Sequence, residues 1–179
     1  MTRVHFHLDP FPGEDAIARI EISGGIGRSG NDFALHYLLS GDISQVVIPA
    51  PSDSPERKDG LWEHTCFELF LAPKGSRSYW EFNISPSGDW NVYHFRDYRQ
   101  DMREESAFET LPFRVSANAD YLSLFLECNL AGIVNDQKAL EIAISAVIRT
   151  LDDQVSYRAL KHRGTKPDFH RRDGFAIEL

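Results

Sequence analysis

The sequence predicts an all-β protein: a jelly-roll or immunoglobulin-like sandwich of two antiparallel sheets, with about ten strands and little helix. Three observations support this prediction. Apolar and polar residues alternate with a period of two in nearly every structured segment. Clusters rich in Gly, Pro, Ser and Asp separate these segments at short intervals. No long amphipathic helix and no alternation of strands with helices is visible, which disfavours a parallel sheet.

The predicted strands account for most of the chain. They lie at 3–8, 16–22, 32–41, 45–50, 61–72, 77–85, 89–96, 113–119, 121–130, 139–150, 155–162 and 174–179. Turn clusters separate them, among them SGGIGRSGN at 23–31 and a long segment at 49–60. The segment DYRQDMREESAF at 97–108 is expected to form one or two helical turns. Because no repeat or linker is visible, residues 1–179 are expected to form a single domain.

Composition limits the classes of function. The chain has 179 residues, of which 42% are hydrophobic and 26% charged, as in a folded domain. Acids outnumber Lys and Arg by 27 to 19, giving a net charge of −8, which argues against nucleic acid or an anionic membrane as partner. No apolar run approaches the ~18 residues that cross a membrane. With no signal segment visible, a cytoplasmic location and reduced Cys66 and Cys128 are expected.

An acidic and aromatic face is predicted on two neighbouring strands. Alternation in LWEHTCFELF puts Trp62 and Glu68 on the face opposite the apolar residues, and alternation in YWEFNIS puts Glu81 and Asn83 there. A four-residue turn at PKGS would set Glu68 directly opposite Glu81, roughly 5 Å apart at Cβ, where like charges cost up to ~1 kcal/mol. Three things could relieve this repulsion: a bridging cation (Arg, Lys or calcium), protonation of one carboxyl, or a ligand in a groove that offers hydroxyl groups. The alternative to a binding site is an exposed, solvated face with a neighbouring arginine.

The next hairpin, which turns at SPSG, has two candidate registers. A five-residue loop would place Trp90 and Val92 in the core, leaving Asn91 and Tyr93 on the acidic face. A four-residue loop would instead place Tyr93 and Phe95 in the core. The five-residue loop is the preferred interpretation.

LWEHTCFELFL followed by YWEFNISPSGDW resembles the pattern of family 9 carbohydrate-binding modules and the wider DOMON-like sandwiches. In these, a Trp begins an acidic strand of the type W-x-x-D-x-x-E-x-F, and a strand ending in aromatic-x-N follows. The closing KPDFHRRDGFAIEL is similar to the end of a stand-alone bacterial DOMON-like group. The resemblance covers 61–98 and 162–179. It implies a jelly-roll-like sandwich that binds sugar on one sheet face between two aromatic rings.

The resemblance also implies roles for single residues. By motif position, Trp62 would be one stacking ring, Glu68 a hydroxyl acceptor and Asn83 an amide contact. The modules carry a second sandwiching tryptophan late in the chain, whereas all three tryptophans here come early. The resemblance therefore implies that Phe169 or Tyr157 takes that place.

The loop HRGTKPDFHRRDGF near the C-terminus is expected to close one side of the site with Lys166, Asp168 and His170. The alternative is a surface loop held by local ion pairs. The predicted ligand-binding residues are Trp62, Glu68, Glu81, Asn83, Lys166, Asp168 and His170.

No cofactor is expected. The C-terminal loop contains no H-x-H pair, which argues against a zinc site. Calcium bound by loop carboxylates stays an alternative. Some DOMON domains bind haem through Met and His. The candidate haem ligands in this chain are Met102 with His94, His162 or His170. The polar surroundings of Met102, RQDMREE, argue against a haem pocket.

The expected function is non-catalytic binding of a small saccharide or similar polyhydroxylated ligand. A carboxylate pair also serves in glycoside hydrolysis, but two carboxyls on one sheet face cannot flank the bond to be cleaved. G-x-S-x-G, a phosphate loop and H-E-x-x-H are absent from the sequence. The alternatives are a protein-interaction sandwich that forms a homodimer and, less favoured, a haem-binding DOMON domain.

Overall fold

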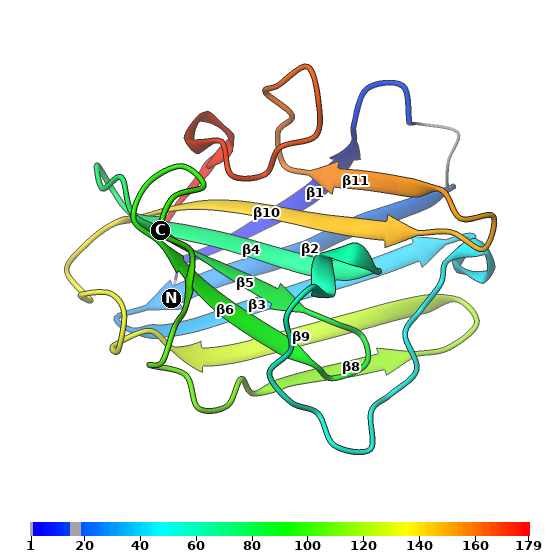
Figure 1. Ribbon diagram of the computed structural model, residues 1–179, viewed down its shortest axis with the longest axis horizontal. Helices are drawn as coiled ribbons and strands as arrows, with labels where there is room; N and C mark the ends of the chain where they lie inside the picture. The colour runs from blue at the N-terminus through cyan, green and yellow to red at the C-terminus, as the bar shows by residue number, and fades with distance from the viewer. Residues whose placement is uncertain (1, 15–18) are drawn as a thin grey trace.

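The computed structural model describes residues 2–14 and 19–179, and in this part the chain is all β with three single-turn 3₁₀ helices (Figure 1). The strands are β1 (Thr2–Pro10), β2 (Ile20–Ser29), β3 (Asp32–Gly41), β4 (Cys66–Pro73), β5 (Tyr79–Ile84), β6 (Trp90–Phe95), β7 (Arg103–Glu104), β8 (Phe113–Ala117), β9 (Tyr121–Asn129), β10 (Leu140–Arg149), β11 (Val155–Ala159) and β12 (Ile177–Glu178). The 3₁₀ helices are η1 (Ile43–Gln45), η2 (Leu61–Glu63) and η3 (Arg172–Gly174).

The strands form one curled antiparallel sheet that resembles a half-barrel. Their order is β7-β6-β5-β4-β10-β11-β1-β2-β3-β9-β8, and β12 pairs with β10 beside this path. Strand β1 joins the two halves of the sheet, because most of it pairs with β2 while Asp9 and Pro10 pair with β11. The predicted all-β class with antiparallel pairing is confirmed. The division into two sheets stays a prediction, since the hydrogen bonding is continuous through β1.

A large apolar core lies between the two halves, with β4, β5 and β10 drawn in front of β2, β3 and β9 in Figure 1. Tyr37 of β3 shows the contact between them. Its ring lies 5.6 Å from that of Phe6 and 4.9 Å from that of Phe67 on β4. Its hydroxyl donates a 2.6 Å hydrogen bond to the backbone oxygen of Glu68. Since Phe67 enters this core, the side chain of Glu68 projects from the other face of β4.

The expected turn at SGGIGRSGN is wrong, because β2 continues through the glycines to Ser29. The turn falls instead at Gly30, whose φ of +61° suits glycine. Gly24 permits a close approach of neighbouring strands, since a Cβ there would lie 1.9 Å from the backbone oxygen of His36. The glycines therefore admit tight packing within a strand. The expected strand residues at 16–18 lie outside the described residues.

Three further expectations differ in detail. The segment at 45–50 makes one isolated bridge, between Val46 and Thr150, and is not a strand. The segment at 97–108 holds β7 and turns instead of helical turns. Strand β4 begins at Cys66, because the preceding residues form η2.

The five-residue loop of the second hairpin is confirmed, since Ile84 pairs with Trp90. Cys66 and Cys128 are free thiols, as expected. Among the described residues, no helix is long and apolar enough to cross a membrane.

Replacing Gly24 by Ala is expected to destabilise the fold by about 1–3 kcal/mol, because the new methyl group would clash with the β3 backbone and the Phe6 ring. The matched control is Gly25→Ala on the same strand, where the nearest atom to a Cβ would lie 3.7 Å away. Urea denaturation of both variants measures the difference. Equal stability of the two variants would contradict the close-approach role of Gly24.

Candidate functional site

The outer face of β4, β5 and β6 is covered by the C-terminal segment and forms a second, smaller apolar cluster. Six buried residues make up this cluster: Phe70, Ala72, Tyr79, Tyr93, Phe95 and Ala143. Phe169 and Phe175, from the C-terminal segment, pack against it. The alternative interpretation of a solvated sheet face is therefore wrong, because the Glu68 and Glu81 residues on this face are only 2% and 5% exposed.

A pocket of about 360 Å³ opens where the C-terminal segment meets this face. The lining comes from β4, β5, β6, β10 and β11, from η2, from the loop after β6 and from the C-terminal segment: Trp62, Glu68, Glu81, Phe95, Arg99, Met102, Val147, Tyr157, Pro167, Asp168, Phe169 and His170. The lining combines three carboxylates, one arginine and several aromatic rings. It is the candidate functional site.

The two glutamates reach the pocket in a register that differs from the expected one by two residues. Glu68 pairs with Asn83, and Glu81 pairs with Phe70, so the glutamates are diagonal neighbours. The cause is a connection two residues longer than expected, because β5 begins at Tyr79 and not at Arg77. A shift of two residues keeps every side chain on its face, so both glutamates still share the pocket.

Few polar groups contact the buried carboxylates. Glu68 accepts a hydrogen bond of 3.3 Å from Ser145 Oγ, and Glu81 accepts one of 2.9 Å from Asn83 Nδ2. His170 Nε2 lies 3.7 Å from Glu81 Oε2, while its Nδ1 hydrogen-bonds with the Tyr79 hydroxyl at 2.8 Å. The glutamates thus have single neutral donors where ionised carboxylates would favour several.

Burial shifts the protonation of these groups toward neutral forms. Burial and then the charge of Glu81 raise the pKa of Glu68 well above its usual range. Burial raises the pKa of Glu81 to about 7, against the opposing effects of the Asn83 hydrogen bond and the Arg99 charge. Burial followed by the charge of Arg99 lowers the pKa of His170 to about 4. At neutral pH the imidazole is therefore neutral and supplies no charge to Glu81.

Arg99 and Asp168 form an ion pair at the rim of the pocket. Arg99 Nη2 lies 3.0 Å from Asp168 Oδ1, and the Tyr98 hydroxyl donates to Asp168 Oδ2 at 2.6 Å. Burial alone would raise the pKa of Asp168, but the hydrogen bonds from Tyr98 and Arg99 outweigh it and hold that pKa below its usual value. Arg99 has a φ of 52°, and its backbone N–H donates to the Tyr79 hydroxyl at 3.2 Å.

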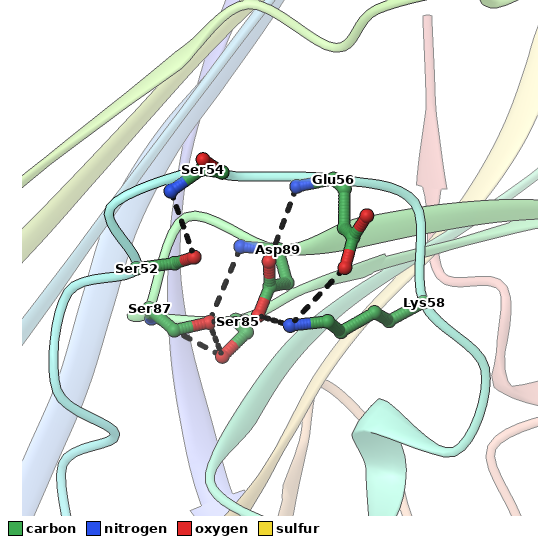
Figure 2. Close-up of polar contacts among 7 residues, drawn as sticks. All are labelled: Ser52, Ser54, Glu56, Lys58, Ser85, Ser87 and Asp89. Carbon is green, nitrogen blue, oxygen red and sulfur yellow. Dashed lines mark hydrogen bonds and ion pairs between the residues drawn. The ribbon is translucent and has the colours of Figure 1, made fainter.

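Trp62 reaches the pocket from η2, at the end of a long loop that is tied to the β5–β6 turn. Figure 2 shows these ties, which centre on Asp89. Asp89 accepts a hydrogen bond from the Glu56 backbone N–H at 3.1 Å and pairs with Lys58 Nζ at 2.9 Å. The Trp62 ring then packs edge-on against Tyr93, with centroids 5.9 Å apart. The loop thereby holds Trp62 beside the pocket although it does not belong to β4.

The structure brings five of the seven predicted site residues into the pocket lining: Trp62, Glu68, Glu81, Asp168 and His170. Asn83 is fully buried behind Glu81, and Lys166 is exposed and outside the lining. Phe169 and Tyr157, the two candidates for a second ring, both line the pocket, with centroids 6.1 Å apart. Arg99 was missed, because nothing in its sequence neighbourhood indicates that its turn folds over Tyr79.

No group of three or more His, Cys, Asp or Glu side chains that could hold a metal ion occurs in the described part of the chain. Of the histidines considered with Met102 as haem ligands, His170 shares the pocket with it, whereas His94 and His162 do not line it. His170 faces Tyr79 with one ring nitrogen and Glu81 with the other. That arrangement is a poor fit to an axial haem ligand.

Comparison with known proteins shows likeness in fold. A crystal structure from Bacteroides uniformis, of a protein to which carbohydrate binding is ascribed, matches with a TM-score of 0.76 and 18% identity, over 96% of this chain and 83% of that one. This match shows that the two chains share a fold.

Two structures of a family 9 carbohydrate-binding module from Caldicellulosiruptor kristjanssonii, with glucose and with cellotriose, match with TM-scores of 0.47 and 0.46. Both are 10% identical and cover 80% of this chain, and 68% and 66% of theirs. The sequence matches no protein-family model and no curated protein.

Replacing Glu81 by Gln is expected to stabilise the fold more at about pH 8 than at about pH 4.5. The folded protein holds the Glu81 proton up to a pKa of about 7, whereas the unfolded chain releases it near the ordinary value of 4.5. The wild type therefore loses stability as the pH rises between these values, and the variant lacks the part of that loss that comes from Glu81. The difference should reach on the order of 1–3 kcal/mol, measured by urea denaturation across this range.

Glu21→Gln, at an exposed position on β2, is the matched control for this experiment. A stability difference between E81Q and the wild type that stays constant with pH would show that Glu81 is not held in its neutral form by burial.

Proposed function

We propose that this protein binds a small saccharide or a similar polyhydroxylated ligand in the pocket between the outer sheet face and the C-terminal segment, without catalysing a reaction. The observation that carries the proposal is the presence of two buried carboxyl groups beside aromatic rings in one pocket. Its volume of about 360 Å³ is near the lower end of the range for small-molecule sites, about 300–1,000 Å³. A ligand of one or two sugar rings suits this size.

Aromatic rings on two sides of the pocket would contact the apolar face of a sugar. Trp62 is 36% exposed, so its ring is open to stacking by a ligand. Tyr157 and Phe169 lie together in the lining, one from β11 and the other from the C-terminal segment. Flat rings of this kind offer apolar contact with specific orientation at little cost in side-chain entropy.

The carboxylates would accept hydrogen bonds from sugar hydroxyl groups. Glu68 keeps unused acceptor capacity beyond its bond from Ser145, and so does Glu81 beyond its bond from Asn83. Because Asn83 is fully buried, we assign it the role of orienting Glu81 and not of contacting the ligand. Asp168, tied to Arg99 and Tyr98, would close the rim. Lys166 has no role in this proposal.

The non-catalytic part of the proposal rests on where the carboxyl groups lie. Glycoside hydrolysis needs an acid and a base or nucleophile on opposite sides of the scissile bond. Glu68 and Glu81 are diagonal neighbours on one sheet face, and the Asp168 carboxylate opposite them is held by Arg99 and Tyr98. The carbohydrate binding ascribed to the Bacteroides uniformis protein of the same fold agrees with this proposal.

A second candidate is self-association through the rim of the pocket. Trp62 and Met102 line the pocket and are 36% and 45% exposed, and Tyr98 beside them is 45% exposed. Exposed apolar side chains gathered in one place are typical of interaction surfaces. This candidate predicts a dimer that weakens when Trp62 is replaced.

Mono- and disaccharides at high concentration are expected to raise the unfolding temperature of the wild type, with the response tested in the presence of calcium and of a chelator. Saturation at 100 times the dissociation constant stabilises by ~2.7 kcal/mol, or about 5–10 °C for a domain of this size. Trp62→Ala should weaken the affinity for the responding sugar about tenfold, because one stacking ring is lost. Isothermal titration calorimetry measures that affinity.

The control is Tyr121→Ala, which removes an equally exposed ring, 37% against 36%, on the other half of the sheet. No response to any sugar would overturn the saccharide proposal. Sedimentation at several protein concentrations decides the second candidate, since a dimer that is lost in W62A but kept in Y121A would favour self-association.

A further inference from the structure

The charges that line the pocket are unbalanced toward acid. Apart from the phenol of Tyr157, its ionisable lining residues are Glu68, Glu81, Asp168, His170 and Arg99. The single arginine forms its ion pair with Asp168, 3.0 Å away, and its charge acts on Glu68 and Glu81 without an ion pair to either. In the described part of the chain, neither Glu68 nor Glu81 forms an ion pair with a lysine or arginine. His170 Nε2, 3.7 Å from Glu81, would have to be protonated to serve as one.

A buried carboxylate pair without an ion-pair partner is costly, and structures satisfy such pairs with a counter-charge or a proton. Neutral sugar hydroxyls supply hydrogen bonds but no charge. A metal ion would supply charge, yet no cluster of three or more metal-ligating acids, His or Cys is present among the described residues. A ligand with a protonated amine supplies both charge and hydrogen-bond donors. It would also lie among aromatic rings, which attract cations over their faces.

We infer that the saccharide bound here is an amino sugar, whose ammonium group lies between Glu68 and Glu81 while Trp62 stacks on the ring. This inference rests on the proposed function and deepens it. The two carboxylates lie on the sheet side of the pocket, and the ring of Trp62 reaches it from η2. A sugar ring lying against Trp62 can therefore direct one substituent at the carboxylates.

Binding of an ammonium group should be linked to the release of a proton from the carboxylate pair. Charged and titratable groups face Glu81 from several elements: Cys66 and Glu68 of β4, Tyr79 of β5, Tyr93 of β6, Arg99 of the following loop, and Asp168 and His170 of the C-terminal segment. The tyrosines and the thiol stay neutral across the range tested, because burial raises the pKa of each. Asp168 and Arg99 stay charged and paired. Glu68 and Glu81 are thus the groups whose ionisation an ammonium ligand would promote, because burial raises the pKa of both.

The test is calorimetric titration of the full chain with D-glucosamine and D-galactosamine, each against its uncharged parent sugar and its N-acetyl derivative. The amino sugar of one configuration is expected to bind at least tenfold more tightly than both uncharged partners. Its affinity should rise about tenfold between about pH 5 and about pH 7, as the carboxylate pair loses its proton. The N-acetyl derivative keeps the ring and the nitrogen but not the charge, so it isolates the contribution of the ammonium group.

Glu81→Gln should strongly reduce both the preference for the amine and the rise with pH, because one of the two carboxyl groups is lost, while keeping residual affinity for the ring. Glu21→Gln, exposed on β2, should keep both. Thermal unfolding of E81Q checks that the variant is folded. If E81Q does not fold, proton release by the wild type, measured by titration in buffers of different ionisation enthalpy, replaces it.

Each outcome of these titrations either supports or overturns the inference. A preference for the amine that depends on pH and on Glu81, or that is accompanied by proton release, supports the inference. Equal or tighter binding of an uncharged sugar overturns the inference and leaves the proposed function standing. Tight amine binding without pH dependence or proton release overturns the placement of the ammonium group at the carboxylates. Failure of all six sugars to bind overturns the inference.

The wider panel of mono- and disaccharides separates failure of all six sugars from failure of the proposed function. A response to another, uncharged sugar keeps the proposed function, and no response to any sugar overturns both the inference and the proposed function.

Discussion

Burial of the outer face of β4, β5 and β6 beneath the C-terminal segment is the constraint on which the candidate site depends. Without it, Glu68 and Glu81 would be ordinary acids on a wet sheet face. The segment is held at its end by β12, which pairs with β10, and its rings enter the second apolar cluster. Packing of this segment therefore creates the pocket and, through desolvation, sets the protonation of the acids inside it.

The hydrophobic pattern was enough to predict the class of fold and the sheet face on which Glu68, Glu81 and Asn83 lie. Successive side chains of a strand alternate between its two faces, so a register error of two residues leaves each side chain on its predicted face. The predicted face of Glu68 and Glu81 is therefore correct although their predicted register is wrong. The register itself depended on the length of the connection after β4. PKGS has the composition of a complete four-residue turn, and nothing in the sequence shows that Arg77 and Ser78 lengthen it.

Other parts of the site depend on tertiary contacts that local pattern does not encode. Trp62 was placed on the correct side for an incorrect reason, because it lies on η2 and not on β4. Its position comes from the ties between its loop and Asp89 (Figure 2). Arg99 enters the pocket from a turn with a left-handed backbone. The glycines of β2 resemble a turn in composition, and only the closeness of β3 explains them as a strand.

The junction made by β1 has a consequence for how the chain folds. Asp9 and Pro10 pair with Ala159 and Arg158, so closing the sheet joins strands from nearly opposite ends of the sequence. Contacts of such high sequence separation carry a large loop-closure entropy and slow the folding of β proteins. The hairpins from β2 to β3 and from β4 to β6 are local by comparison and can form first. The strands within each half of the sheet can thus pair before β1 joins the two halves. The core closes only after residues 155–159 have been synthesised and have paired with β1.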